Sequence, residues 1–245
     1  MFVLDCDTSG STMNSLCSAF RCSPSRLENV LLSIDIEKHY EEHWETISVS
    51  DYLYDYVVQC LGAHEFVQTV MWFHATRTLP SNNFLDGVLT LSEVLPKLWA
   101  SLIQHAPDDE TRIQIKEVIE NDNFGPRFRH KITNDVDGGP FGVLVKDVIL
   151  SNGGLNHGDY LGMPEIIEDA FGCIVASKLK PVLVPKIVKF RARSEYARGE
   201  VFHALNYLYN AVRGQPPGQS CVYCFDGEGV AIQTDRIEYV AVQDL

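Results

Sequence analysis

Apolar residues recur every three or four positions in several parts of the chain, which is the spacing that places them on one face of an α-helix. Leu53, Tyr56, Val57 and Cys60 follow this spacing, and Gly62 is the kind of residue that ends a helix. The same reasoning predicts helices that begin at Pro24, Ser50, Ser92, Asp108, Pro164 and Ser194.

Other segments are rich in β-branched and aromatic residues, which favour strands. Strands are predicted at 66–74, 141–150 and 182–190, with two or three short ones between 220 and 242. Loops are predicted at 121–140 and 151–162, because Gly and Pro punctuate both. Helices dominate the first half and the strands are scattered, so we expect an α+β fold with a helical N-terminal half packed on a small, mixed or split antiparallel sheet.

The domain organisation follows from length and local composition. Residues 1–24 are rich in Ser, Cys and small polar residues, and we expect a poorly ordered segment there. The sequence contains no internal repeat and no low-complexity linker. Mixed folds of this size often form one core, so residues 25–245 are predicted to be a single α+β domain.

Composition narrows the class of protein. The apolar fraction of 45% and the charged fraction of 22% are ordinary for a globular chain. No apolar run approaches the roughly 18 residues of a membrane helix, and the N-terminus lacks a signal-peptide pattern. The seven cysteines are odd in number and irregular in spacing, which favours reduced thiols. We therefore expect a soluble, cytoplasmic protein without a membrane partner.

The formal net charge of -13 disfavours a protein that binds mainly through nucleic-acid phosphates. Basic residues nevertheless form two local clusters. One consists of Arg127, Arg129, His130 and Lys131, and the other of the Lys and Arg residues between 178 and 198. Contact with nucleic acid or another phosphate-bearing ligand is expected only at these clusters.

Several motifs are absent from the sequence: the Gly-rich dinucleotide fingerprint, the phosphate-binding loop, the zinc-binding HExxH helix and the GxSxG nucleophile elbow. Cys221 and Cys224 have the spacing of half a zinc site, but no second pair follows. The sequence therefore does not predict a metal site with named ligands.

The most informative segment runs from Trp72 to Thr78. His74 stands at the end of a predicted buried strand, Thr76 and Arg77 follow, and a Gly87-Val88-Leu89 step leads into a helix. This order resembles the opening motif of the ADP-ribosyltransferase superfamily, which includes poly(ADP-ribose) polymerases and bacterial toxins. The resemblance implies NAD as co-substrate, bound near His74, Thr76 and Arg77.

A second segment, 157–168, extends this resemblance. In that superfamily a glutamate late in the domain lies near the start of a strand beside the nicotinamide ribose, and Glu165 is similar in context. Tyr160 could supply the ring that stacks on nicotinamide, and Phe141 is the alternative. The implied catalytic set is His74, Tyr160 and Glu165.

Each implied role has a chemical reason. Cleavage of the bond between nicotinamide and ribose builds positive charge on the sugar, which a carboxylate such as that of Glu165 stabilises. A neutral His74 can hydrogen-bond a ribose hydroxyl, and the planar guanidinium of Arg77 can pair with the pyrophosphate. The leading hypothesis is therefore an enzyme that transfers ADP-ribose from NAD to an unidentified macromolecular acceptor.

Two other classes of function remain open on the sequence. A metal-dependent hydrolase could use His157, Asp159 and Glu165, which lie close together and include imidazole and carboxylate ligands. A non-catalytic acidic interaction protein, of the immunity or adaptor type, fits the negative charge and the lack of an unmistakable catalytic motif.

Overall fold

The computed structural model describes residues 2–43, 48–133, 138–151 and 159–243, with only the backbone described at 42, 43, 159 and 160. The chain divides into two compact units where the sequence predicts one domain. Unit 1 consists of Met1–Phe73, Val143–Leu155 and Arg191–Phe225, and unit 2 of His74–Gly142, Asn156–Phe190 and Asp226–Leu245. Each unit is assembled from three separated stretches, so neither is visible as a continuous segment in the sequence.

The fold is α+β, as predicted. The sheet has the strand order β5-β3-β2-β4-β6, and β1 pairs with β2. Its strands are β1 (Phe2–Leu4), β2 (Val67–Thr78), β3 (Phe141–Val143), β4 (Val184–Arg193), β5 (Cys224–Asp226) and β6 (Ile237–Val242). The β1–β2 pair is parallel, whereas the β2–β3 and β4–β6 pairs are antiparallel, so the sheet is mixed.

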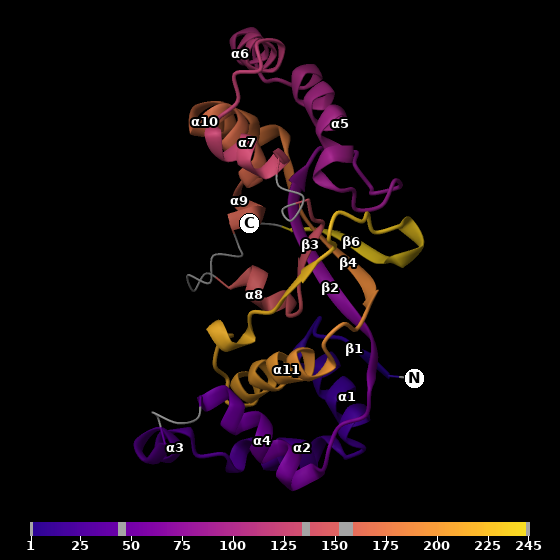
Figure 1. The fold of residues 1–245 in the computed structure, drawn as a ribbon, viewed down its shortest axis with the longest axis vertical. Coiled ribbons are helices and arrows are strands. Elements are labelled where there is room, and N and C mark those ends of the chain that lie inside the picture. Colours follow the sequence, from indigo (N-terminus) through magenta and orange to yellow (C-terminus); the bar gives the residue numbers. More distant parts are fainter. Residues whose placement is uncertain (1, 44–47, 134–137, 152–158, 244–245) are drawn as a thin grey trace. The chain divides into compact units, whose positions relative to one another are not determined.

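Helices surround the strand ends of unit 1 (Figure 1). They are α1 (Ser9–Phe20), α2 (Pro24–Ser33), α3 (Ile36–His43), α4 (Val49–Leu61), α8 (Lys146–Leu150) and α11 (Ala197–Val212). Helix α11 packs against α1, α2 and α4, and its apolar face is fully buried at Val201, Ala204 and Leu205.

Residues 2–24 are ordered in unit 1, where the sequence predicts a poorly ordered segment. Phe2 and Leu4 of β1 are buried, and β1 pairs with the start of β2. Thr8 caps α1 in a reciprocal capping box with Ser11. The small polar residues that indicated disorder therefore serve as the cap of a helix whose Leu16 and Phe20 are buried.

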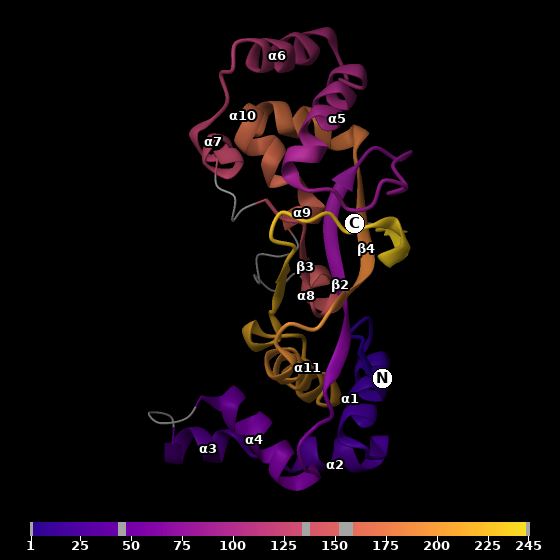
Figure 2. The ribbon, with the colours of Figure 1, turned by 45° about the vertical axis from the view of Figure 1, so that its right-hand side comes forward.

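The helices of unit 2 lie near the part of β2 that belongs to this unit (Figure 2). They are α5 (Leu91–Gln104), α6 (Asp109–Glu120), α7 (Pro126–Thr133), α9 (Asp159–Gly162) and α10 (Glu165–Leu179). Helix α10 packs against α6 and α7, and α5 packs against α6. No helix in the described part of the chain is both long enough and apolar enough to span a membrane.

Most predicted elements are confirmed, with shifts at their ends. The cap of α5 is Thr90, not Ser92, and Pro96 lies beyond the first helical turn. The predicted strand 141–150 ends at Val143 and continues into α8. The predicted loop 121–140 contains α7, because Pro126 follows Gly125 at the first helical position, where a missing N–H costs nothing.

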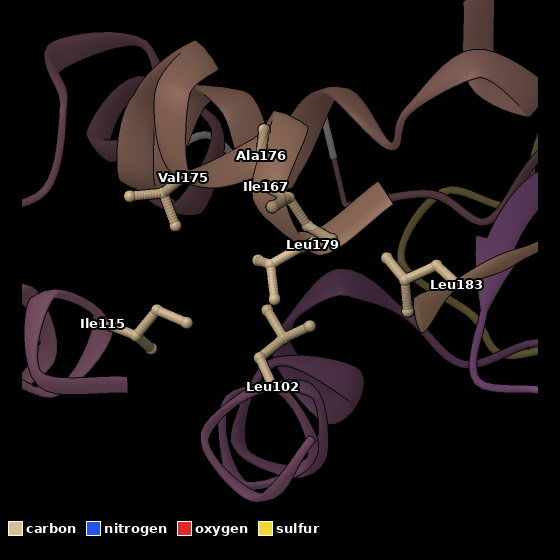
Figure 3. Close-up of a cluster of buried hydrophobic side chains, with 7 residues drawn as sticks. All are labelled: Leu102, Ile115, Ile167, Val175, Ala176, Leu179 and Leu183. Atoms are coloured by element: carbon tan, nitrogen blue, oxygen red, sulfur yellow. The ribbon is translucent and has the colours of Figure 1, made fainter. Parts of the chain in front are cut away.

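A cluster of buried apolar side chains holds the helices of unit 2 together (Figure 3). Its members come from α5, α6, α10 and the residue just before β4: Leu102, Ile115, Ile167, Val175, Ala176, Leu179 and Leu183. Figure 3 shows Leu179 of α10 facing Leu102 of α5. Since Leu179 is fully buried, it supports the contact of α10 with its neighbours.

We predict that Leu179→Ala lowers the free energy of unfolding by about 2–5 kcal/mol, because it removes buried methyl groups and leaves a cavity. Urea denaturation followed by circular dichroism measures this change. Ile174→Ala is the matched control on the same helix, since Ile174 is 72% exposed and its truncation should cost little. Equal losses in both variants would contradict the assignment of this core.

Candidate functional site

Strand β2 continues to Thr78, so His74 lies within the strand and not at its end as predicted. Because side chains alternate between the two faces of a strand, His74 and Thr76 share one face and Arg77 lies on the other. The segment from His74 to Thr78 belongs wholly to unit 2. Strand β2 thus places the side chains of His74 and Thr76 on one face of the sheet and that of Arg77 on the opposite face.

A cavity of about 1190 Å³ opens beside this end of β2, and all its lining residues belong to unit 2. This volume is sufficient for a drug-sized ligand or cofactor. Its wall is built from β2, the loop that follows it, α5, α7, the segment before β3 and the start of α10. The predicted residues on this wall are His74, Thr76, Arg77, Phe141 and Glu165.

His74 is held in one orientation by the chain next to β3. Its Nδ1 lies 2.7 Å from the carbonyl oxygen of Phe141. Because a carbonyl can only accept, Nδ1 carries the proton and Nε2 of the neutral ring is an acceptor. No described residue hydrogen-bonds Nε2. Burial lowers the pKa of His74 and outweighs the opposing effect of the Phe141 carbonyl, so the imidazole is neutral at pH 7.

Phe141 and Thr76 complete this part of the wall. Phe141 is 45% exposed and lines the cavity. The Thr76 side chain is half-buried, and its hydroxyl makes no hydrogen bond to another described residue. This wall therefore presents an imidazole acceptor, a hydroxyl and an aromatic surface to a ligand.

Arg77 has a structural role instead of a free guanidinium. Its terminal nitrogens donate to the carbonyl oxygens of Leu161 at 2.7 Å, Leu183 at 2.8 Å and Lys180 at 3.4 Å. Burial lowers the pKa of Arg77, and its buried Nε has no partner among the described residues. The donors predicted to bind pyrophosphate are thus already used by the backbone.

Glu165 is also engaged within the protein. Its carboxylate lies 2.8 Å from Nζ of Lys131, which also contacts Asp169 at 2.7 Å. Burial alone would lower the pKa of Lys131, but hydrogen bonds to Asp169 and Glu165 raise it overall. The ammonium therefore stays charged and neutralises a carboxylate on the cavity wall.

The predicted context of Glu165 differs from the structure. Glu165 begins helix α10, where a carboxylate favours the helix dipole, and it does not begin a strand. Glu238 has the expected place, as the second residue of β6, although it does not line the cavity. One strand, β4, separates β6 from β2. Glu238, which lies late in the chain in the run 237–242 of strand-forming residues, was not among the site residues predicted from the sequence.

Tyr160 cannot be placed relative to the other site residues. Its backbone belongs to α9, but its side chain lies outside the described residues, as do His157 and the side chain of Asp159. No group of three or more His, Cys, Asp or Glu residues suited to a metal occurs in the described ranges. Cys221 is buried and Cys224 is exposed, and both are free thiols.

Two further features of the wall extend the prediction of a basic cluster at 127–131, which did not include its helix or the contribution of Lys186. Arg127 and His130 line the cavity from α7, although the sequence placed them in a loop. Lys186, only 3% exposed, donates to the carbonyl oxygens of Leu79, Pro80 and Asn82 at 2.5–3.2 Å. A buried lysine from β4 therefore holds the loop that forms one side of the cavity.

The predicted Gly87-Val88-Leu89 step has a backbone role. Val88 and Ile232 exchange two backbone hydrogen bonds of 2.9 Å. Gly87 has a φ of 85°, and a Cβ at this position would overlap the carbonyl oxygen of Ile232. Only glycine satisfies both constraints, so Gly87 allows the cavity loop to lie against the C-terminal segment.

Comparison of the chain with family models, with curated proteins and with solved structures finds no match.

We predict that the imidazole of His74 titrates below the ordinary pKa of about 6.5, because burial disfavours the charged ring. The unfolded chain then binds the proton more readily, so this residue lowers the free energy of unfolding as pH falls below that value. Ring resonances measured by NMR over a pH series report the pKa, and His74→Gln identifies the signal. Titration at or above the ordinary value would contradict the buried, neutral state.

We predict that Arg77→Met destabilises the protein by about 2–4 kcal/mol, since three backbone carbonyls lose a charged donor. Chemical denaturation measures the loss. Arg129→Met is the control, because Arg129 is exposed and makes a surface ion pair with Asp122, which contributes little. An Arg77 variant as stable as the control would show that these hydrogen bonds are not structural.

Proposed function

We propose that unit 2 is an ADP-ribosyltransferase that binds NAD in the cavity and transfers ADP-ribose to a macromolecular acceptor. The observation that carries this proposal is the meeting of His74, Thr76 and Phe141, from separate parts of the chain, on one wall of a cavity of about 1190 Å³. Unpartnered polar atoms and an exposed ring converge there, as expected of a ligand site.

In this proposal His74 binds the ribose. With Nδ1 donating to Phe141, the free lone pair of Nε2 accepts a hydrogen bond from a ribose hydroxyl. The Phe141 carbonyl fixes both the tautomer and the ring orientation, so the sugar is held without rearrangement of the imidazole. The ring of Phe141, next to this contact and 45% exposed, offers a face for nicotinamide.

The reaction breaks the bond between ribose C1′ and the nicotinamide nitrogen, and the electron pair leaves with nicotinamide. The acceptor nucleophile then forms a bond to C1′ and releases its proton. Positive charge on the ribose is greatest between these events, so a carboxylate near C1′ lowers the barrier. The hydroxyl of Thr76, on the same face of β2 as His74, supplies a second polar contact to the ligand.

Two glutamates are candidates for that carboxylate. Glu165 lines the cavity but is paired with Lys131. Glu238 stands near the start of β6, two strands from β2, a separation of about 10 Å between strand axes. Replacing Glu165 or Glu238 with Gln removes the negative charge and keeps the size of the side chain. The two variants therefore show which carboxylate the reaction requires.

We predict that the purified protein binds NAD in calorimetry and slowly releases nicotinamide to water. His74→Ala should lower this rate about 10²–10³-fold. His105→Ala is the control, because His105 lies outside the cavity and bonds only its own helix at Ser101. Loss of the rate in Glu165→Gln or in Glu238→Gln alone identifies the carboxylate.

Either of two results would overturn the proposal. One is no NAD binding by the unmodified protein. The other is full nicotinamide release by both Gln variants, because the reaction requires a carboxylate at the ribose. A stable protein partner together with absence of NAD binding would instead favour the non-catalytic interaction protein.

A further inference from the structure

The charges on the cavity wall differ from those of the whole chain. The lining cations Arg77, Lys97, Arg127 and Lys131 outnumber the lining carboxylates Asp86 and Glu165, whereas the chain carries a net charge of -13. A positive cavity in an acidic protein concentrates anionic ligands while the rest of the surface repels nucleic acid. The cavity is therefore suited to a small anion more than to a polyanion.

Most of these cations are already paired. Arg77 donates to three carbonyls, Lys97 contacts Asp86 at 2.6 Å, and Lys131 bridges Glu165 and Asp169. Arg127 and His130 differ: both line the cavity, both are exposed, and neither contacts another described side chain or carbonyl.

Helix α7 presents these two residues together. Arg127 and His130 are three positions apart, so they lie on the same face of the helix, one turn from each other. Phe128, between them, is fully buried and fixes the rotation of α7 about its axis. Arg129 is not part of the cavity wall and pairs with Asp122. The helix therefore aims one guanidinium and one imidazole at the same space.

We propose that Arg127 and His130 form the subsite for the phosphate groups of the ligand. The guanidinium of Arg127 can donate two parallel hydrogen bonds to phosphate oxygens, and the His130 ring adds a third donor. The ligand class is an organic diphosphate. Its identification with NAD rests on the proposed function, whereas the subsite itself rests on the two unpaired side chains. The terminal nitrogens of Arg77, the cation that the sequence indicated, already donate to carbonyls, and its Nε is buried.

The subsite is tested with inorganic diphosphate titrated into the full chain by calorimetry. We expect binding to the unmodified protein, and an affinity at least about tenfold lower for the double variant Arg127→Gln with His130→Gln, which removes charge-assisted hydrogen bonds. Arg129→Gln is the matched control on the same helix and should bind as the parent does. Ring resonances of His130 should shift on binding, and those of His105 should not.

The outcomes separate this subsite from the proposed function. No binding of diphosphate by the parent, or equal affinity in the double variant, overturns the subsite. Binding that depends on Arg127 and His130, without any cleavage of NAD, supports the subsite and overturns the transferase. NAD cleavage by the double variant with an unchanged KM supports the transferase and overturns the subsite.

Discussion

The cavity side of unit 2 depends on two cations, the half-buried Arg77 and the buried Lys186, whose partners are backbone carbonyls. Arg77 from β2 joins the end of α9 to the turn between α10 and β4, and Lys186 from β4 secures the loop that follows β2. Removing a cation from water is costly unless its donors find acceptors, so these carbonyl contacts constrain the path of the backbone around both side chains. The shape of the cavity follows from that requirement.

This arrangement divides the cations of unit 2 by role. Those that donate to carbonyls maintain the wall, and Lys131 pairs with two carboxylates of α10. The cations left for a ligand come from α7, a short helix with one buried aromatic anchor. In the proposed function, the chemistry at His74 and the recognition of phosphate by Arg127 and His130 therefore belong to different elements, β2 and α7.

Local signals predicted much of the fold. Helices such as α4 and α6 have regular apolar spacing and side-chain caps at Ser48 and Asp108, so their positions could be predicted from the sequence. Helix α7 was missed because its Gly-Pro start resembles a turn and its one buried residue, Phe128, gives no periodicity. The order of residues 2–20 depends on the pairing of β1 with β2, more than 60 positions away, and no local pattern contains it.

The candidate site was also predicted from the sequence only in part. Alternation along β2 accounts for His74 and Thr76 on one face, and His74, Phe141 and Glu165 do line one cavity. The use of Arg77 depends on carbonyls 84 and 106 positions further along the chain, which residue type alone does not reveal. The same limit applies to Glu165, since its pairing with Lys131 exists only once α7 and α10 are packed.

The contact of Gly87 with Ile232 makes the cavity sensitive to the far end of the sequence. Val88 completes its backbone hydrogen bonds only with Ile232, and the hydroxyl of Thr234 donates to the carbonyl of Leu85 in the same loop. A proteolytic cut ahead of Ile232 would free the loop that lines the cavity while leaving His74 in its strand. The C-terminal segment therefore braces the loop that lines the cavity, and through β6 it also pairs with β4, so the cavity wall and the edge of the sheet depend on the same stretch of chain.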